Sequence, residues 1–138
     1  MKTITVYIIY SMLYIVNIII STRLNFKQPY KKPKFQPPDF IFPIVWSILY
    51  TLLFFSIKNL DSNLTKIFFI IQMIINVSWS TIFNNQYYIN SLILIFILLF
   101  LNIFIFMKDK IFLLLPYIIW LSFASILNIY YLTQKYKN

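Results

Sequence analysis

The 138-residue chain contains no cysteine, no histidine, no glutamate and no glycine. Without cysteine and histidine, a disulfide scaffold, a Cys/His zinc site and His-based acid–base catalysis are excluded. Without glycine, the glycine-rich loops that cradle phosphate groups are excluded as well. These absences remove several classes of enzyme and metal site before any residue that is present is considered.

Charge is also scarce: 11% of the residues are charged, whereas 61% are apolar or aromatic. An ordinary soluble domain has about 25% charged and roughly 45–50% apolar residues. A soluble globular domain is therefore excluded, and disorder is excluded with it because disorder requires low hydrophobicity. The composition predicts a small membrane protein of one domain.

Five apolar stretches have about the length that a helix needs to cross a bilayer, roughly 20 residues. A membrane-spanning strand needs only about 9–11 residues of alternating polarity, so helices are favoured over a barrel. We predict an all-α, multi-pass integral membrane protein, a bundle of five transmembrane helices in one domain over 1–138. Its helices cover about 4–22, 40–57, 64–83, 89–107 and 111–132.

The first stretch also has features of a signal peptide, with Lys2 as its basic start. A signal peptide has a shorter apolar region, about 7–15 residues, followed by a small-residue cleavage site. Three tyrosines interrupt a longer run here and no such site follows. We expect a retained helix, with a cleaved signal as the alternative.

The segment 23–39 is the one long connection, and it holds four prolines and five basic residues. Loops of this length are usually functional or floppy, and prolines reduce floppiness by restricting the backbone. We predict a stiff, basic lid over one end of the bundle; a plain linker is the alternative. The prolines and basic residues are Pro29, Pro33, Pro37 and Pro38, and Arg23, Lys27, Lys31, Lys32 and Lys34.

Basic residues are divided seven to five between the two ends of a five-span bundle. The larger number lies with the first loop and the C-terminus, which favours a cytoplasmic location for that end. Because these residues sit at membrane ends, they suit anionic lipid headgroups, and we expect no nucleic-acid partner.

Amides and hydroxyls are the polar groups within the spans. No Asp, Glu, His, Lys or Arg lies deep in a span, which argues against a proton relay or a charged ion path. Gln72, Asn76 and Ser80 are spaced by four and share one helix face. That face should point into the bundle or at a neighbouring subunit, either joining helices or contacting a ligand.

Three tryptophans, Trp46, Trp79 and Trp120, lie one each in the second, third and fifth stretches. Tryptophan usually gathers at the membrane interface. Trp46 and Trp120 are too deep for that, whereas Trp79 is near a helix end and fits it. Aromatic rings inside a bundle favour a flat, apolar ligand, with ordinary aromatic packing as the alternative.

Three blocks resemble the signature of the TspO/MBR family of tryptophan-rich sensory and translocator proteins. The segment 32–50 reads KPKFQPPDFIFPIVWSILY, 76–83 reads NVSWSTIF, and 116–128 reads PYIIWLSFASILN. They match the family's first-loop and second-helix block, its third-helix block and its fifth-helix block, in that order. The chain departs from the family at Phe26 and Lys27, where many members have Trp-Tyr, at Pro43, often glycine, and at Val77, often tryptophan.

The resemblance implies a cavity under the first loop that binds porphyrins, with synthetic benzodiazepine-type ligands as competitors and sterols as ligands of animal members. It also implies a homodimer, often through the third helix, and no cofactor. Lysines 31, 32 and 34 would meet the carboxylates of a porphyrin. The implied ligand-binding residues are Trp46, Tyr50, Asn76, Trp79, Trp120, Leu121, Phe123 and Asn128, with Pro37 and Pro38 in the lid.

The resemblance implies two functions, and the sequence leaves a third, plainer one open. The first is binding of porphyrins or other tetrapyrroles for their transport or sensing. The second is light-dependent porphyrin degradation through Trp46 and Trp120, and a bundle that only scaffolds partners is a third, plainer alternative. A weak sterol pattern fits Leu127, Tyr130 or Tyr131, and Lys135, but an interfacial tyrosine belt with a basic cap is the favoured explanation.

Overall fold

In the computed structural model, residues 1–23 and 31–137 are described, and they form five long helices. Each is long and apolar enough to span a membrane, which confirms the predicted multi-pass, all-α integral membrane protein. The helices are α1 (Thr3–Arg23), α2 (Ile41–Ser56), α3 (Asn63–Asn84), α4 (Tyr88–Asp109) and α5 (Leu115–Lys135). Short 3-10 turns, η1 (Ile57–Asn59) and η2 (Phe112–Leu114), extend α2 and precede α5.

Local signals explain where two of the helices begin. A reciprocal capping box starts α3: the Thr65 backbone N–H donates to Ser62 Oγ and the Ser62 N–H donates to Thr65 Oγ1, both at 3.2 Å. Pro116 lies in the first turn of α5, where a missing N–H costs nothing. Lys66, which falls inside a predicted span, is in the first turn of α3, and its Nζ donates to the Met1 carbonyl at 3.0 Å. Its charge therefore stays at the end of the bundle.

The absence of glycine has a consequence for the backbone. Gln86, between α3 and α4, has φ 66°, and Lys110, just after α4, has φ 54° and ψ 47°. Glycine is the usual residue in such left-handed positions because it has no Cβ. Both turns instead hold long polar side chains, at a cost in backbone energy.

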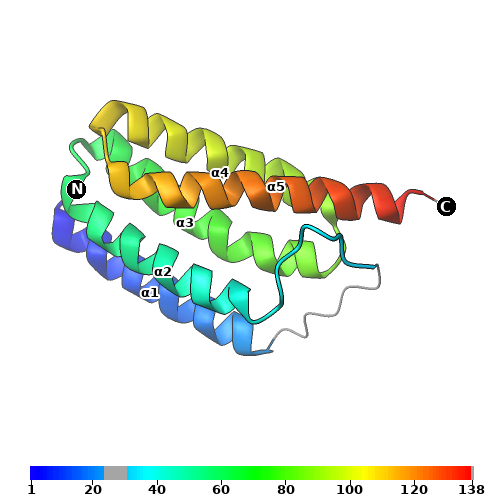
Figure 1. Ribbon diagram of the computed structural model, residues 1–138. Coiled ribbons are helices and arrows are strands. Elements are labelled where there is room, and N and C mark those ends of the chain that lie inside the picture. The colour runs from blue at the N-terminus through cyan, green and yellow to red at the C-terminus, as the bar shows by residue number, and fades with distance from the viewer. Residues whose placement is uncertain (24–30, 138) are drawn as a thin grey trace.

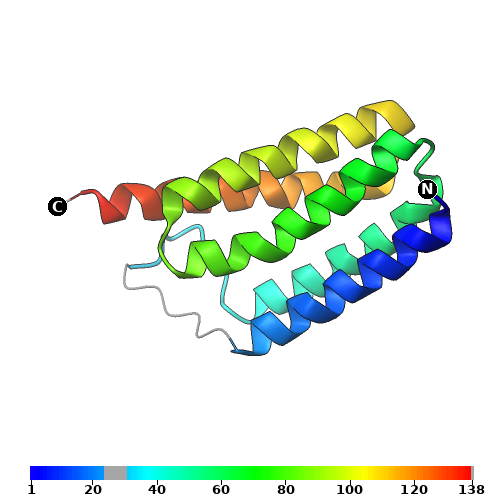
Figure 2. The ribbon, with the colours of Figure 1, turned by 180° about the vertical axis from the view of Figure 1, so that it is seen from behind.

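Figure 1 shows the bundle from the side, with the N-terminus at one end and the C-terminus at the other, as five crossings require. Helices α1 and α2 lie side by side, and α4 packs against both α3 and α5. Figure 2, from behind, shows α3 running between α4 and α1. The segment that leads into α2 lies at the same end of the bundle as the C-terminal end of α5.

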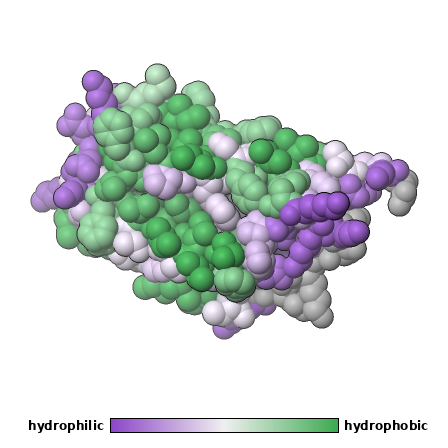
Figure 3. All heavy atoms as spheres, viewed as in Figure 1, coloured by the Kyte–Doolittle hydropathy of each residue, from purple (hydrophilic) through white to green (hydrophobic). Residues whose placement is uncertain are grey.

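The surface has the pattern of a protein surrounded by lipid. Figure 3 shows hydrophobic side chains over the middle of the visible face and hydrophilic ones at the two ends. Helix α1 illustrates this: Val6 and Tyr10 are its buried residues, while Ile4, Ile8 and Met12 are exposed. An apolar surface of this extent is unfavourable in water but suits the hydrocarbon of a bilayer.

Candidate ligand-binding cavity

A cavity of about 420 Å³ lies between α1, α2, α3 and α5. The loop residues Lys32, Gln36 and Asp39 line its outer end, so the cavity opens where the first loop crosses the bundle. Small-molecule sites typically have volumes of about 300–1,000 Å³ and mostly apolar walls with a few polar groups. The cavity has the size and the lining of such a site.

Aromatic rings form two separate groups in the cavity wall. In one group, the Trp46 and Trp120 rings meet edge to face, with centroids 6.3 Å apart, and Phe42 packs on Trp120 at 5.6 Å. In the other group, Trp79 stacks on Phe83 with centroids 4.9 Å apart. All three tryptophans line the cavity, so Trp79, which the sequence also allowed at the membrane interface, belongs to the interior set.

The floor of the cavity is polar. Tyr50 from α2 and Asn76 from α3 both line it, and the Tyr50 hydroxyl donates to Asn76 Oδ1 at 2.5 Å. Beneath them, Asn76 Nδ2 donates to the fully buried Tyr117 hydroxyl at 2.5 Å. That hydroxyl in turn donates to Gln72 Oε1 at 3.1 Å. The floor therefore presents a hydrogen-bonded pair that is itself held from below.

This network joins all five helices. The Tyr10 hydroxyl of α1 donates to the Tyr50 carbonyl at 2.5 Å, and Asn102 Nδ2 of α4 donates to Gln72 Oε1 at 3.3 Å. Buried polar groups in hydrocarbon need internal partners, because no water is available there. The face of α3 that carries Gln72 and Asn76 thus joins helices, and at Asn76 it also meets the cavity.

Asn128 lies behind one aromatic wall. It is fully buried, and its Oδ1 accepts from Trp79 Nε1 at 3.3 Å and from Ser91 Oγ at 2.8 Å. Its Nδ2 donates to the Tyr88 carbonyl at 2.8 Å. Asn128 therefore orients the Trp79 indole from behind and does not itself line the cavity.

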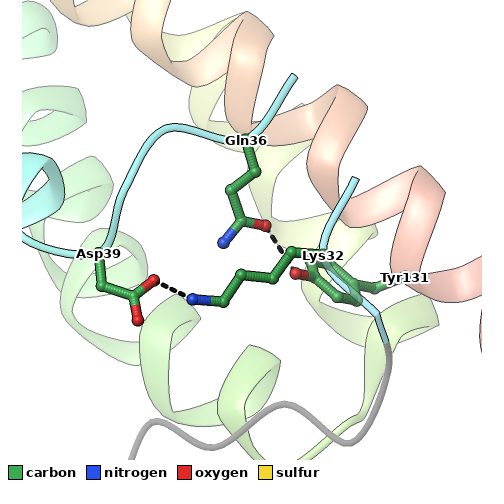
Figure 4. Close-up of polar contacts among 4 residues, drawn as sticks. All are labelled: Lys32, Gln36, Asp39 and Tyr131. Carbon is green, nitrogen blue, oxygen red and sulfur yellow. Dashed lines mark hydrogen bonds and ion pairs between the residues drawn. The ribbon is translucent and has the colours of Figure 1, made fainter. Parts of the chain in front are cut away.

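The loop is fastened across the mouth by polar contacts (Figure 4). The Tyr131 hydroxyl of α5 donates to Gln36 Oε1 at 2.6 Å, and Lys32 Nζ pairs with Asp39 Oδ1 at 2.5 Å. Next to them, the Tyr130 hydroxyl donates to the Lys31 carbonyl at 3.0 Å. The described part of the loop is thus attached to α5 by two hydrogen bonds while it crosses the cavity.

The structure brings together five of the residues predicted from the sequence. Other predicted residues lie around them: Leu121 is buried in the core, and Phe123 packs on the Trp120 ring at 5.2 Å. Pro37 and Pro38 lie in the loop between Gln36 and Asp39 without lining the cavity. Lys27 and Pro29, which the predicted lid includes, and Phe26 fall outside the described residues. The five that line the cavity together are Trp46, Tyr50, Asn76, Trp79 and Trp120.

Several lining residues were not predicted, although helical spacing carried the signal. Positions four or three apart share a helix face, and Ala124, Leu127 and Tyr131 continue the face of Trp120 on α5. Leu127 and Tyr131, predicted only as part of the weak sterol pattern, therefore face the cavity. The other unpredicted lining residues are Asn17, Ser21, Gln36, Asp39, Phe42, Pro43 and Phe83, whereas Ser80 lies on the polar α3 face that the sequence offered for a ligand contact.

Comparison with known proteins identifies the family. The TspO/MBR family profile matches residues 3–133. The chain is 32% identical, over an alignment of 112 residues, to the tryptophan-rich protein TspO of Chlorobaculum tepidum; the match covers 70% of this chain and 71% of the relative. It is 30% identical over 115 residues to protein CrtK of Rhodobacter capsulatus, a match that covers 71% of each. The chain belongs to the TspO/MBR family.

Proposed function

We propose that the protein binds porphyrins or related tetrapyrroles in this cavity and acts in their transport or sensing, with residues 31–39 as the lid. The observation that carries the proposal is the combination of two aromatic walls, a polar floor and a cation at the mouth of one cavity. A porphyrin has matching parts, since it is a flat apolar ring with carboxylates at one edge.

Each part of the cavity has a chemical counterpart in such a ligand. The rings of Trp46, Trp120 and Trp79 offer faces and edges for stacking against a macrocycle. The Trp120 indole N–H is buried and has no hydrogen-bond partner within the described residues, which leaves it for a ligand acceptor. At the mouth, Lys32 supplies a positive charge for a carboxylate.

Filling the cavity tests the proposal. Ala124 is buried and lines the cavity, so Ala124→Phe places a ring where the ligand would lie. Ser122 is exposed on the same helix, and Ser122→Phe is the matched control. Protoporphyrin affinity is measured by titrating the quenching of tryptophan fluorescence in detergent micelles. The dissociation constant should rise at least tenfold in the Ala124 variant and stay unchanged in the Ser122 variant. Equal binding by both variants would place the ligand elsewhere.

Light-dependent porphyrin degradation is a second candidate, favoured by the edge-to-face contact of Trp46 and Trp120 at 6.3 Å in one cavity wall. A porphyrin stacked there lies against two oxidisable indoles. Illumination of the complex with dissolved dioxygen as the oxidant should then consume porphyrin, and Trp120→Phe should abolish that loss while binding persists. Porphyrin that stays intact under light, although it quenches tryptophan fluorescence, supports the transport or sensing role alone.

A further inference from the structure

The mouth of the cavity carries two opposite charges that are already paired with each other. Lys32 and Asp39 both line the cavity, and Lys32 Nζ lies 2.5 Å from Asp39 Oδ1 (Figure 4). Their side chains are 52% and 75% exposed, so solvent reaches the pair. Between them in sequence, Gln36 accepts a hydrogen bond from the Tyr131 hydroxyl, which attaches this part of the loop to α5 independently of the two charges.

Among the described residues that line the cavity, Lys32 is the cation and Asp39 is the anion. Lys31 and Lys34 are exposed on the same loop but do not line the cavity. Among the described residues that line the cavity, an incoming carboxylate therefore meets one positive charge, Lys32, and that charge is already paired with the Asp39 carboxylate.

We propose that Asp39 occupies the position of a ligand carboxylate at Lys32, so that an anionic ligand enters by exchanging its own carboxylate for that of Asp39. The inference rests on the proposed function and names the residue that sets its preference for charge. When a ligand carboxylate binds Lys32, Asp39 turns out into solvent, because two carboxylates beside one ammonium group repel each other. An uncharged ligand leaves the pair closed above it.

Asp39 thereby lowers the affinity for anionic ligands and leaves the affinity for neutral ones unchanged. An exposed ion pair is weak, and its loss changes a dissociation constant by up to about fivefold. Salt screens the interaction, so the difference should shrink at high ionic strength. The effect is small but specific to charge, which makes it measurable by comparing two ligands on the same protein.

The experiment compares protoporphyrin, which carries two carboxylates, with its uncharged dimethyl ester. Dissociation constants are measured by tryptophan quenching in detergent micelles for the wild type, Asp39→Asn, Lys32→Gln and the double variant. Asp61→Asn is the matched control, since Asp61 is an exposed aspartate at the opposite end of the bundle. All these positions are exposed, so the variants are expected to fold.

The Asp39 variant should bind protoporphyrin about three- to fivefold more tightly than the wild type, with the ester unchanged. The Lys32 variant should bind protoporphyrin more weakly, and the double variant should gain nothing over it, because without Lys32 there is no charge for Asp39 to occupy. A gain for both ligands, an equal gain in the Asp61 control, or no gain overturns the role of Asp39. If the wild type binds neither ligand, the proposed function itself is wrong.

Discussion

Replacing Tyr117 by phenylalanine removes one oxygen from the centre of the bundle and tests whether the polar network holds the helices together. Tyr117 is fully buried, and its hydroxyl accepts from Asn76 at 2.5 Å and donates to Gln72 at 3.1 Å. Gln72 Oε1 keeps Asn102 as a donor at 3.3 Å, but Asn76 Nδ2 loses the Tyr117 hydroxyl as its acceptor.

The expected loss of stability follows from two changes: the bond from Tyr117 to Gln72 disappears, and the Asn76 amide is left without its acceptor. A hydrogen bond between membrane helices contributes about 0.6 kcal/mol on average and up to about 1.7 kcal/mol. A buried donor left without a partner costs about 1–3 kcal/mol. Because the ring and its packing remain, we expect Tyr117→Phe to lower the free energy of unfolding by about 1–3 kcal/mol.

Reversible unfolding in mixed micelles, followed by circular dichroism as the denaturing detergent increases, measures this change. Tyr136→Phe is the control, because Tyr136 is 65% exposed beyond the end of α5 and should change stability by less than about 0.5 kcal/mol. A Tyr117 variant as stable as this control would refute the view that the network stabilises the bundle. If the network does stabilise the bundle, combining Tyr117→Phe with Asn76→Ala should lower the free energy of unfolding by less than the sum of the two single changes, since the two residues share one bond.

Three further predictions use the same preparations. Trp79→Phe should lower the free energy of unfolding by less than about 1 kcal/mol, because its bond to Asn128 is long, 3.3 Å, and Asn128 keeps two other partners. A decrease of more than about 2 kcal/mol would contradict this. Lys110→Gly should raise stability by up to about 1 kcal/mol, since Lys110 has a left-handed backbone; a loss of stability would show that it carries no strain. Tyr131→Phe removes the bond that fastens Gln36 and should speed protoporphyrin release in stopped-flow quenching, whereas an unchanged rate would separate the loop from ligand exit.

The fold was predictable because each span repeats one simple signal, an apolar run of bilayer length. The ends of the helices were harder to place. The third helix begins earlier than its apolar run because the capping box of Ser62 and Thr65 starts it among polar residues. The fifth begins later, since a 3-10 turn takes up Phe112–Leu114 before Pro116 opens the regular helix.

The site was predictable where the chain places an unusual side chain in an apolar run, as at Trp46, Asn76 and Trp120. What the sequence left open was the direction in which each of these side chains points. Asn128 was predicted to contact the ligand, yet it lies behind Trp79 and does not line the cavity. The sequence indicates its position along the helix but not which side of the Trp79 ring it contacts. The pairing of Lys32 with Asp39 could not be read from sequence, since it depends on how the loop turns between them.

The hydrogen-bond network beneath Tyr50 and Asn76 closes the cavity at one end, so the cavity is not a channel through the bundle. A molecule that reaches the floor meets hydrogen bonds contributed by all five helices, so leaving through the far end would require separating the helices themselves. For a ligand in the proposed site, the floor therefore closes the route along the bundle axis, and the open end is the one that residues 31–39 cross.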